Sequence, residues 1–293
     1  RQMGRIPHKR HTMFKKDDGS LLREQVMGTR GFSGTQSILY HHHMPTEVVK
    51  AELIGSYLPE YEEQKSLKHR LFLTNKTVKK GDALEAREYI LGNQDLLIGT
   101  ALVNEPMKRY YRNGDGDEML FVHYGSGKLE TMFGTLSYRA GDYLLIPIGT
   151  IFRMIPDEKE ETKLLFIESF SQITTPRRYR NEYGQLLEHS PFCERDFRGP
   201  EILETFDDKG EFEIVTKSRG SLHSHILGHH PFDVVGWDGY LYPWAFNVED
   251  FEPITGRVHQ PPPVHQTFEG NNFVVCSFVP RLFDYHPEAI PAP

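Results

Sequence analysis

The feature of this chain that most restricts its fold is a series of short segments rich in β-forming residues, each bounded by glycine or proline turns. These segments are residues 118–124, 143–147, 164–168, 212–217 and 273–280. Short strands at such spacing are typical of a β-sandwich or a jelly roll. Helix signals are few, and we expect only a short helix within 176–187 and a weaker one within 48–57. The sequence therefore predicts a mainly β protein.

Length, charge and cysteine content narrow the class of protein. The 293 residues are enough for one large domain or two smaller ones, each with its own core. The 34 basic and 41 acidic residues give a net charge of −7 without a basic block, which argues against a nucleic-acid partner. No apolar run approaches the roughly 18 residues of a membrane span, and the first residues do not lead into a signal peptide. The only cysteines, Cys193 and Cys276, lack metal-ligand or redox spacing, so we expect ordinary buried thiols in a soluble, cytoplasmic protein.

Residues 110–152 have the outline of a cupin barrel, the small jelly roll that often holds a metal ion. In a metal-binding cupin, histidines occupy the places that here hold Tyr111, Asn113 and Phe152. A divalent metal needs about three converging nitrogen or oxygen donors, and Glu118 alone does not supply them. We therefore expect a degenerate barrel that serves as a scaffold and holds no metal.

Several unusual sequence segments of this chain occur together, in the same order, in one enzyme family. They are residues 6–12, 28–34, 39–46, 113–117 and 231–237, the pattern of Tyr242, Pro243 and Asn247, and the later His259. In these segments the chain resembles the homogentisate 1,2-dioxygenases. Its amino-terminal segments resemble the bacterial branch of that family. The resemblance implies a bicupin fold of two double-stranded β-helix barrels, of which the first is degenerate and the second binds iron.

A Pro- and Gly-rich connection precedes residues 244–251, which are therefore the most plausible domain boundary. Residues 1–245 would form an N-terminal β-sandwich with the degenerate cupin barrel, and residues 246–293 would begin a C-terminal catalytic cupin domain that is truncated here. The two histidines and one glutamate that bind iron in the family are expected after Pro293. We therefore expect Fe(II) as a cofactor of the full-length family member, and neither iron ligands nor catalysis in this chain alone.

The activity implied by the resemblance is an Fe(II)-dependent, extradiol-type cleavage by O2 of homogentisate or a related dihydroxyphenyl acid. The product would be maleylacetoacetate, an intermediate of tyrosine and phenylalanine catabolism. The resemblance makes His259 the base that takes the phenolic proton, a role that suits imidazole with its pKa near 6.5. His265, six residues further on, is the alternative base.

The resemblance leaves the substrate-binding residues unknown and implies further copies of the chain as partners, in a trimer-based homo-oligomer. Two other functions stay open. One is a non-catalytic cupin module for ligand binding or assembly, which needs no metal. The other is a metal-dependent cupin isomerase, which shares the fold but consumes no O2.

Two groups of histidines elsewhere in the chain could be mistaken for metal sites. They are His41, His42 and His43 in one group, and His223, His225, His229 and His230 in the other. On a strand the alternate members of the first group point to opposite faces, so we favour a structural or substrate-edge role. The second group is the better metal candidate because four imidazoles lie within eight positions, but hydrogen-bonded or solvated surface is the favoured interpretation.

Overall fold

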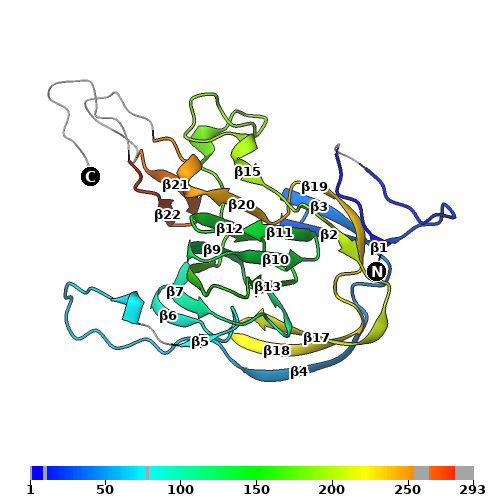
Figure 1. Ribbon diagram of the computed structural model, residues 1–293, viewed down its shortest axis with the longest axis horizontal. Helices are drawn as coiled ribbons and strands as arrows, with labels where there is room; N and C mark the ends of the chain where they lie inside the picture. The colour runs from blue at the N-terminus through cyan, green and yellow to red at the C-terminus, as the bar shows by residue number, and fades with distance from the viewer. Residues whose placement is uncertain (1, 9–11, 77–78, 254–263, 281–293) are drawn as a thin grey trace.

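The computed structural model describes residues 2–8, 12–76, 79–253 and 264–280 of the chain. Two large, mostly antiparallel sheets face each other and form the body of the molecule (Figure 1). The seven-stranded sheet consists, in order, of β11 (Gly134–Tyr138), β10 (Gly127–Thr131), β13 (Phe152–Pro156), β8 (Tyr110–Asn113), β17 (Lys209–Ser218), β18 (Ser221–His229) and β4 (Val48–Ser56). The eight-stranded sheet consists of β15 (Phe197–Arg198), β20 (Trp244–Asn247), β12 (Asp142–Ile146), β9 (Asp117–Tyr124), β14 (Thr162–Ser169), β7 (Leu96–Val103) and β5 (Lys80–Gly81), with β6 (Glu88–Gly92) paired to β7.

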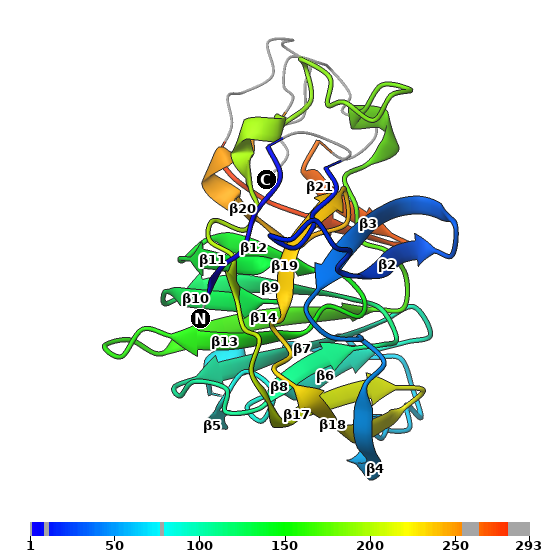
Figure 2. The same ribbon diagram turned by 90° about the vertical axis from the view of Figure 1, so that its right-hand side faces the viewer.

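Three smaller sheets lie around this body. They are the three-stranded sheet of β19 (Val234–Gly239), β3 (Ser33–His41) and β2 (Arg23–Arg30), the hairpin of β21 (Gln266–Gly270) and β22 (Phe273–Cys276), and the pair of β1 (Gln2–Met3) and β16 (Glu204–Thr205). Figure 2 shows β2 and β3 as a hairpin that projects from one side of the barrel. The helices of the described residues are four short 3-10 turns: η1 (Thr74–Lys76), η2 (Arg177–Tyr179), η3 (Glu194–Asp196) and η4 (Val248–Asp250). None of them has the length or the apolar character needed to cross a bilayer.

The alternation of side chains along the central strands explains why apolar residues occupy both of their faces. Successive residues of a strand point to opposite faces of the sheet. In β9, Leu120 therefore joins the core between the two large sheets, whereas Met119 joins a second core on the outer face of the eight-stranded sheet. In β8, Tyr111 faces the inner core and Tyr110 packs outward, toward the layer of the three-stranded sheet. Each face of these strands therefore contributes apolar side chains to a core.

The outer core on the eight-stranded sheet is rich in aromatic side chains. Phe246 of β20 and Phe268 of β21 are both 0% exposed, and their rings meet edge to face with centroids 5.8 Å apart. Phe192 packs against both rings. A backbone bridge between Thr174 and Glu269 adds a further link between the hairpin and the preceding chain. The β21–β22 hairpin thus covers part of the outer face of the barrel.

The structure confirms the mainly β, double-stranded β-helix fold of cupin type that the sequence predicts. The five predicted segments fall in β9, β12, β14, β17 and β22, although the last strand ends at Cys276. The helix predicted over residues 48–57 is wrong, because this segment is β4, which pairs antiparallel with β18 and begins with the β-branched Val48 and Val49. Only the single turn η2 forms within 176–187. Cys193 and Cys276 are free thiols, partly rather than fully buried. The division of the chain near residue 245 stays a prediction.

Candidate functional site

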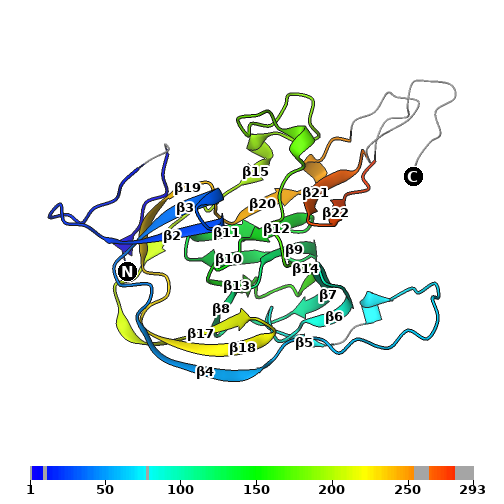
Figure 3. The same ribbon diagram turned by 180° about the vertical axis from the view of Figure 1, so that it is seen from behind.

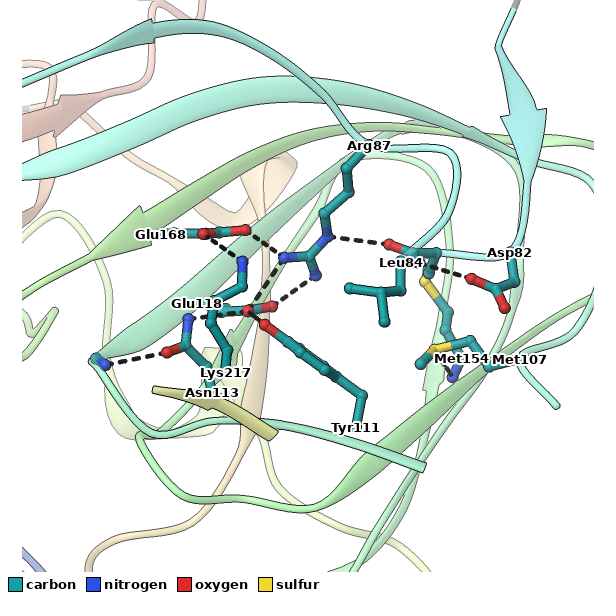
Figure 4. Close-up of polar contacts among 12 residues, drawn as sticks. Asp82, Leu84, Arg87, Met107, Tyr111, Asn113, Glu118, Met154, Glu168 and Lys217 are labelled. Carbon is teal, nitrogen blue, oxygen red and sulfur yellow. Dashed lines mark hydrogen bonds and ion pairs between the residues drawn. The ribbon is translucent and has the colours of Figure 1, made fainter. Parts of the chain in front are cut away.

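Glu118, the carboxylate that remains of the cupin motif, lies inside the barrel and is 0% exposed. Its Oε1 accepts hydrogen bonds from the Tyr111 hydroxyl at 2.6 Å, the Asn113 amide at 3.0 Å and Arg87 Nη1 at 3.1 Å. Its Oε2 accepts from Arg87 Nη2 at 2.7 Å, so the pair is bidentate (Figure 4). Arg87 precedes β6 and is anchored by a hydrogen bond from Nε to the carbonyl oxygen of Ala83.

A second carboxylate, Glu168 of β14, completes this arrangement. Its Oε1 accepts from Arg87 Nη1 at 2.5 Å and from the Tyr89 hydroxyl at 2.9 Å, and its Oε2 accepts from Lys217 Nζ at 2.8 Å. Two cations thus balance two carboxylates, which meets the requirement that buried charges be paired. Figure 4 shows Arg87 and Lys217 beside the carboxylates of Glu118 and Glu168. We call the following set the buried ion network: Arg87, Tyr89, Tyr111, Asn113, Glu118, Glu168 and Lys217.

Burial and charge pairing act in opposite directions on the pKa values of this network. Burial alone raises the pKa of Glu118, but the Arg87 guanidinium and the hydrogen bonds that the carboxylate accepts outweigh burial and hold this pKa well below its usual range. Burial lowers the pKa of Lys217, and Glu168 partly offsets that effect. Burial raises the pKa of the Tyr111 hydroxyl, which therefore keeps its proton and donates it to Glu118. Glu118 is therefore ionised and Tyr111 protonated near neutral pH.

The interior of this barrel does not fit a metal ion. Phe152 occupies one of the three expected ligand places and packs edge to face on Tyr111, with ring centroids 5.3 Å apart. Tyr111 and Asn113 occupy the other two places and donate protons to Glu118, whereas a metal ligand must offer a lone pair. Within the residues that the structure describes, no three His, Cys, Asp or Glu side chains are arranged to hold a metal. Arg87 and Lys217 supply the positive charge that faces the two carboxylates of this interior.

The sequence points to the part of the network near the cupin motif but not to Arg87, Glu168 or Lys217. Two of these residues, Glu168 and Lys217, can be recognised from the alternation of inward and outward side chains along a strand. Glu168 follows two inward positions of β14, and Lys217 follows the inward Val215 of β17 by two residues. A charged residue at an inward position of an apolar strand needs a buried partner. Arg87 lies outside the strands, where no such periodicity exists.

His259, the candidate base, lies outside the described residues, so the structure shows only the alternative. His265 precedes β21 and is 6% exposed. Its Nδ1 lies 3.1 Å from the carbonyl oxygen of Ser277 and donates to it, while its Nε2 is buried and has no hydrogen-bond partner within the described part of the chain. The ring packs against Phe278 with centroids 4.8 Å apart. Because Nδ1 carries the proton, Nε2 is the basic nitrogen of this imidazole.

The first histidine group packs where the three-stranded sheet meets β18. His41 Nδ1 lies 2.7 Å from Asp233 Oδ1 and its Nε2 lies 2.9 Å from Gln25 Oε1, so both ring nitrogens have partners. His43 stacks on His229, with ring centroids 4.9 Å apart. These contacts tie the end of β3 to the start of β19 and the end of β18.

The second histidine group is divided between two environments. His225 Nδ1 lies 3.1 Å from both Arg112 Nη2 and Thr216 Oγ1, on the face of β18. His230 packs among aromatic rings instead, and its Nε2 lies 3.1 Å from the Tyr110 hydroxyl. Burial lowers the pKa of His230 to about 4, which keeps this ring neutral at physiological pH. The structure therefore does not bring the four imidazoles of this group to one point.

A cleft of about 1110 Å³ opens over the end of β12, between β3 and the segment 172–199. Among the residues that line it are Asp117, Arg180 and Trp244. The Asp117 carboxylate accepts hydrogen bonds from the backbone of Ile148 and Ile173, yet its burial raises its pKa to about 6. The floor of the cleft thus contains a carboxyl group that titrates near neutral pH.

Comparison with known proteins finds a matching family model and similar dioxygenases. The family model described as "Homogentisate 1,2-dioxygenase N-terminal" matches residues 82–248, which include most of the barrel and the whole buried ion network. A protein of Saccharolobus solfataricus, provisionally named a dioxygenase, is 44% identical over 292 residues, which are 99% of this chain and 74% of that protein. The homogentisate 1,2-dioxygenase of Legionella pneumophila is 30% identical over 185 residues, which are 62% of this chain and 42% of that enzyme.

Solved structures of cupins align with part of the chain. A cupin-2 domain protein of Shewanella frigidimarina covers 28% of this chain and 78% of its own, at 24% identity and a TM-score of 0.25. A double-stranded β-helix protein of Klebsiella pneumoniae covers 36% and 93%, at 14% identity and a TM-score of 0.31. The match of the family model extends over more than half of the chain, and the Saccharolobus protein is similar over nearly all of it. The chain therefore belongs to the homogentisate 1,2-dioxygenase family.

Proposed function

We propose that this chain is part of an Fe(II)-dependent dioxygenase that cleaves the ring of homogentisate or a related dihydroxyphenyl acid. Both atoms of O2 enter the product, so homogentisate gives maleylacetoacetate, and the reaction serves the breakdown of tyrosine and phenylalanine. The observation that carries this proposal is the family match over residues 82–248, together with relatives named as homogentisate 1,2-dioxygenases. A cytoplasmic location and a trimer-based homo-oligomer belong to the same proposal.

The proposal assigns the described barrel a scaffold role. The barrel interior is filled by charge pairs and hydrogen-bond donors, so its donor set does not fit iron. We place the iron ligands of the proposed enzyme in residues that follow Pro293 in a longer protein. This placement is consistent with the Legionella relative, of which the matched region is 42%.

His259 is the proposed base for the phenolic proton, and His265 is the alternative. Losing a general base costs about two to four decades of rate. The test is O2 uptake with homogentisate by the protein in the length that its own gene encodes, loaded with Fe(II). We expect His259→Ala to lower turnover by about two decades or more, and His265→Ala to lower it much less.

The paired variants separate the possible outcomes. The reverse order of effects would make His265 the base. Unchanged turnover in both variants would reject this part of the proposal, and absence of O2 uptake by the unaltered, iron-loaded protein would reject the activity itself. The intact mass of the native gene product, compared with the 34.0 kDa of this sequence, shows whether a second barrel is present.

A second candidate function is supported by the same barrel interior. A chain whose described residues cannot hold a metal fits a non-catalytic module for ligand binding or assembly. Such a module would bind an aromatic acid saturably and leave it unchanged. Isothermal titration of homogentisate against the iron-free protein, followed by analysis of the recovered ligand, distinguishes this function from ring cleavage.

A further inference from the structure

β4 forms the outer edge of the seven-stranded sheet, and all nine of its residues are exposed. It pairs with β18 on one side, and within the described chain no strand pairs with its other side. Figures 1 and 3 show β4 along the lower rim of the molecule. An open strand edge presents unpaired backbone donors and acceptors and is a template for a further strand.

The composition of this edge is unusual for a strand that faces only water. Val49 is 60% exposed and Leu53 is 68% exposed. The irregular segment that follows, residues 57–73, which we call the arm, also carries exposed apolar side chains. Among them Leu58 is 60% exposed, Leu67 99% and Leu71 84%. Exposed apolar residues that continue from a strand edge into a long irregular segment mark a surface for another protein.

The charged residues of β4 indicate that the other protein is a second copy of this chain. Lys50 and Glu52 stand two residues apart on one face of β4, both more than half exposed, with Nζ and Oε1 2.8 Å apart. When a strand pairs antiparallel with a copy of itself about a two-fold axis, the axis passes beside one residue, and residues equally far from it lie opposite each other. An axis at Ala51 places Lys50 of each copy opposite Glu52 of the other. An axis at Lys50 or Glu52 would instead place like charges opposite each other, which is unfavourable.

We propose that β4 is an interface at which two copies of this chain pair antiparallel about a two-fold axis at Ala51. The register shifts of the β4–β18 pairing occur at Val49 and Ile54, so the regular part of the edge is Lys50–Leu53, and it contains the whole charge pattern. Four residues are too few for the roughly 800 Å² that each partner buries in a stable complex. We assign the remaining apolar surface to the two arms, because their exposed leucines follow directly on β4 in the chain. This assembly is independent of the catalytic activity proposed above.

The first test is a charge swap measured by sedimentation equilibrium. We expect the unaltered chain to form assemblies with a mass that is an even multiple of 34.0 kDa. Lys50→Glu or Glu52→Lys alone should halve that mass and raise the dissociation constant about tenfold or more, because each places two like-charge pairs across the axis. The double variant Lys50→Glu with Glu52→Lys should restore the assembly, since the opposite charges face each other again.

Two controls protect this test against a loss of folding. Lys80→Glu makes the same change in net charge at another exposed ion pair, that of Lys80 with Glu161, and should leave the mass unchanged. Thermal unfolding of each single variant should stay close to that of the unaltered chain, because exposed pairs contribute little to stability. A monomeric unaltered chain, or single reversals that leave the mass unchanged, would overturn the proposal, as would a double variant that fails to reassemble.

A second measurement tests the position of the axis. Opposite residues of an antiparallel pair have Cα atoms about 4.5–5.5 Å apart, within the range that a disulfide spans. In a background of Cys193→Ser and Cys276→Ser, Ala51→Cys should therefore give a covalent dimer on mild oxidation. Ser56→Cys, at the end of the same strand, should give none. Equal cross-linking of the two variants, or none at Ala51→Cys, contradicts the proposed register.

Discussion

Arg87 is the residue on which the barrel interior depends most, because it bonds both buried carboxylates at once. Arg87→Met keeps the unbranched stem of the side chain, removes the guanidinium, and leaves Glu118 and Glu168 with Lys217 as the single cation of the buried ion network. Removing one member of a buried ion pair typically costs about 3–5 kcal/mol. We therefore expect a loss of this size in the free energy of unfolding, measured by urea denaturation at neutral pH.

A matched variant and a double variant isolate the charge effect from the loss of packing. Arg153→Met removes a cation whose partner Glu130 is partly exposed, and should cost about 1 kcal/mol or less. Adding Glu118→Gln to Arg87→Met restores charge balance and should recover part of the loss. A double variant less stable than Arg87→Met would show that packing, rather than charge, explains the first result.

His230 makes stability depend on pH in the mildly acidic range. Burial lowers its pKa to about 4, and its Nδ1 already accepts the backbone N–H of Phe232, so a proton on this nitrogen would face another donor. The unfolded chain binds the proton near its ordinary pKa of 6.5, above the folded value. Stability from this group is therefore present above about pH 6.5 and falls toward pH 4, by at most about 1.4 kcal/mol per pH unit for one proton.

His230→Asn retains an acceptor for Phe232 but does not titrate. We expect the stability advantage of the unaltered chain over this variant to be largest near pH 7 and to shrink as the pH falls, in urea unfolding curves recorded between about pH 7 and pH 4. A difference that is constant over this range would mean that the folded and unfolded chains bind this proton equally, and that burial does not lower the pKa of His230.

At the scale of elements, the sequence predicts best where both faces of a strand are buried. β9, β12 and β14 are read directly from their apolar runs, because no competing pattern is present. β4 is read wrongly as a helix, since its nine exposed residues carry no burial pattern and only its pairing with β18 decides its conformation. Propensity is a weak guide at such a position, where tertiary contacts decide.

The candidate site shows the same limit at the level of side chains. Glu118 and the replacement of its neighbours by Tyr111 and Asn113 can be read from the cupin motif. The cation that compensates the charge cannot, because Arg87 is 31 residues away in sequence and reaches Glu118 only through the fold. Long-range partners of this kind follow from topology rather than from local pattern, which is why the sequence predicts an empty barrel and the structure shows one filled with ion pairs.

At the scale of the whole molecule, the β21–β22 hairpin packs on the barrel, and this packing predicts that the hairpin and the barrel unfold together. Phe268 is 0% exposed and contacts the rings of Tyr143, Phe197 and Trp244. Phe268→Ala should cost about 3–5 kcal/mol, as is typical of a buried phenylalanine. If the layers form one cooperative unit, this loss appears at sites far from the hairpin.

The two tryptophans allow that comparison. Trp244 lies beside Phe268, whereas Trp237 lies in a different core cluster, under the three-stranded sheet. In a Trp244→Phe background Trp237 is the single tryptophan, so tryptophan fluorescence reports on its surroundings. We expect Phe268→Ala to lower the urea midpoint of this fluorescence transition by as much as it lowers the midpoint of the far-ultraviolet circular dichroism transition. Val274→Ala, at a 52% exposed position of β22, should change neither. If Phe268→Ala leaves the urea midpoint of the Trp237 fluorescence transition unchanged, the hairpin unfolds separately. That result would favour the predicted domain division near residue 245 over a single cooperative body.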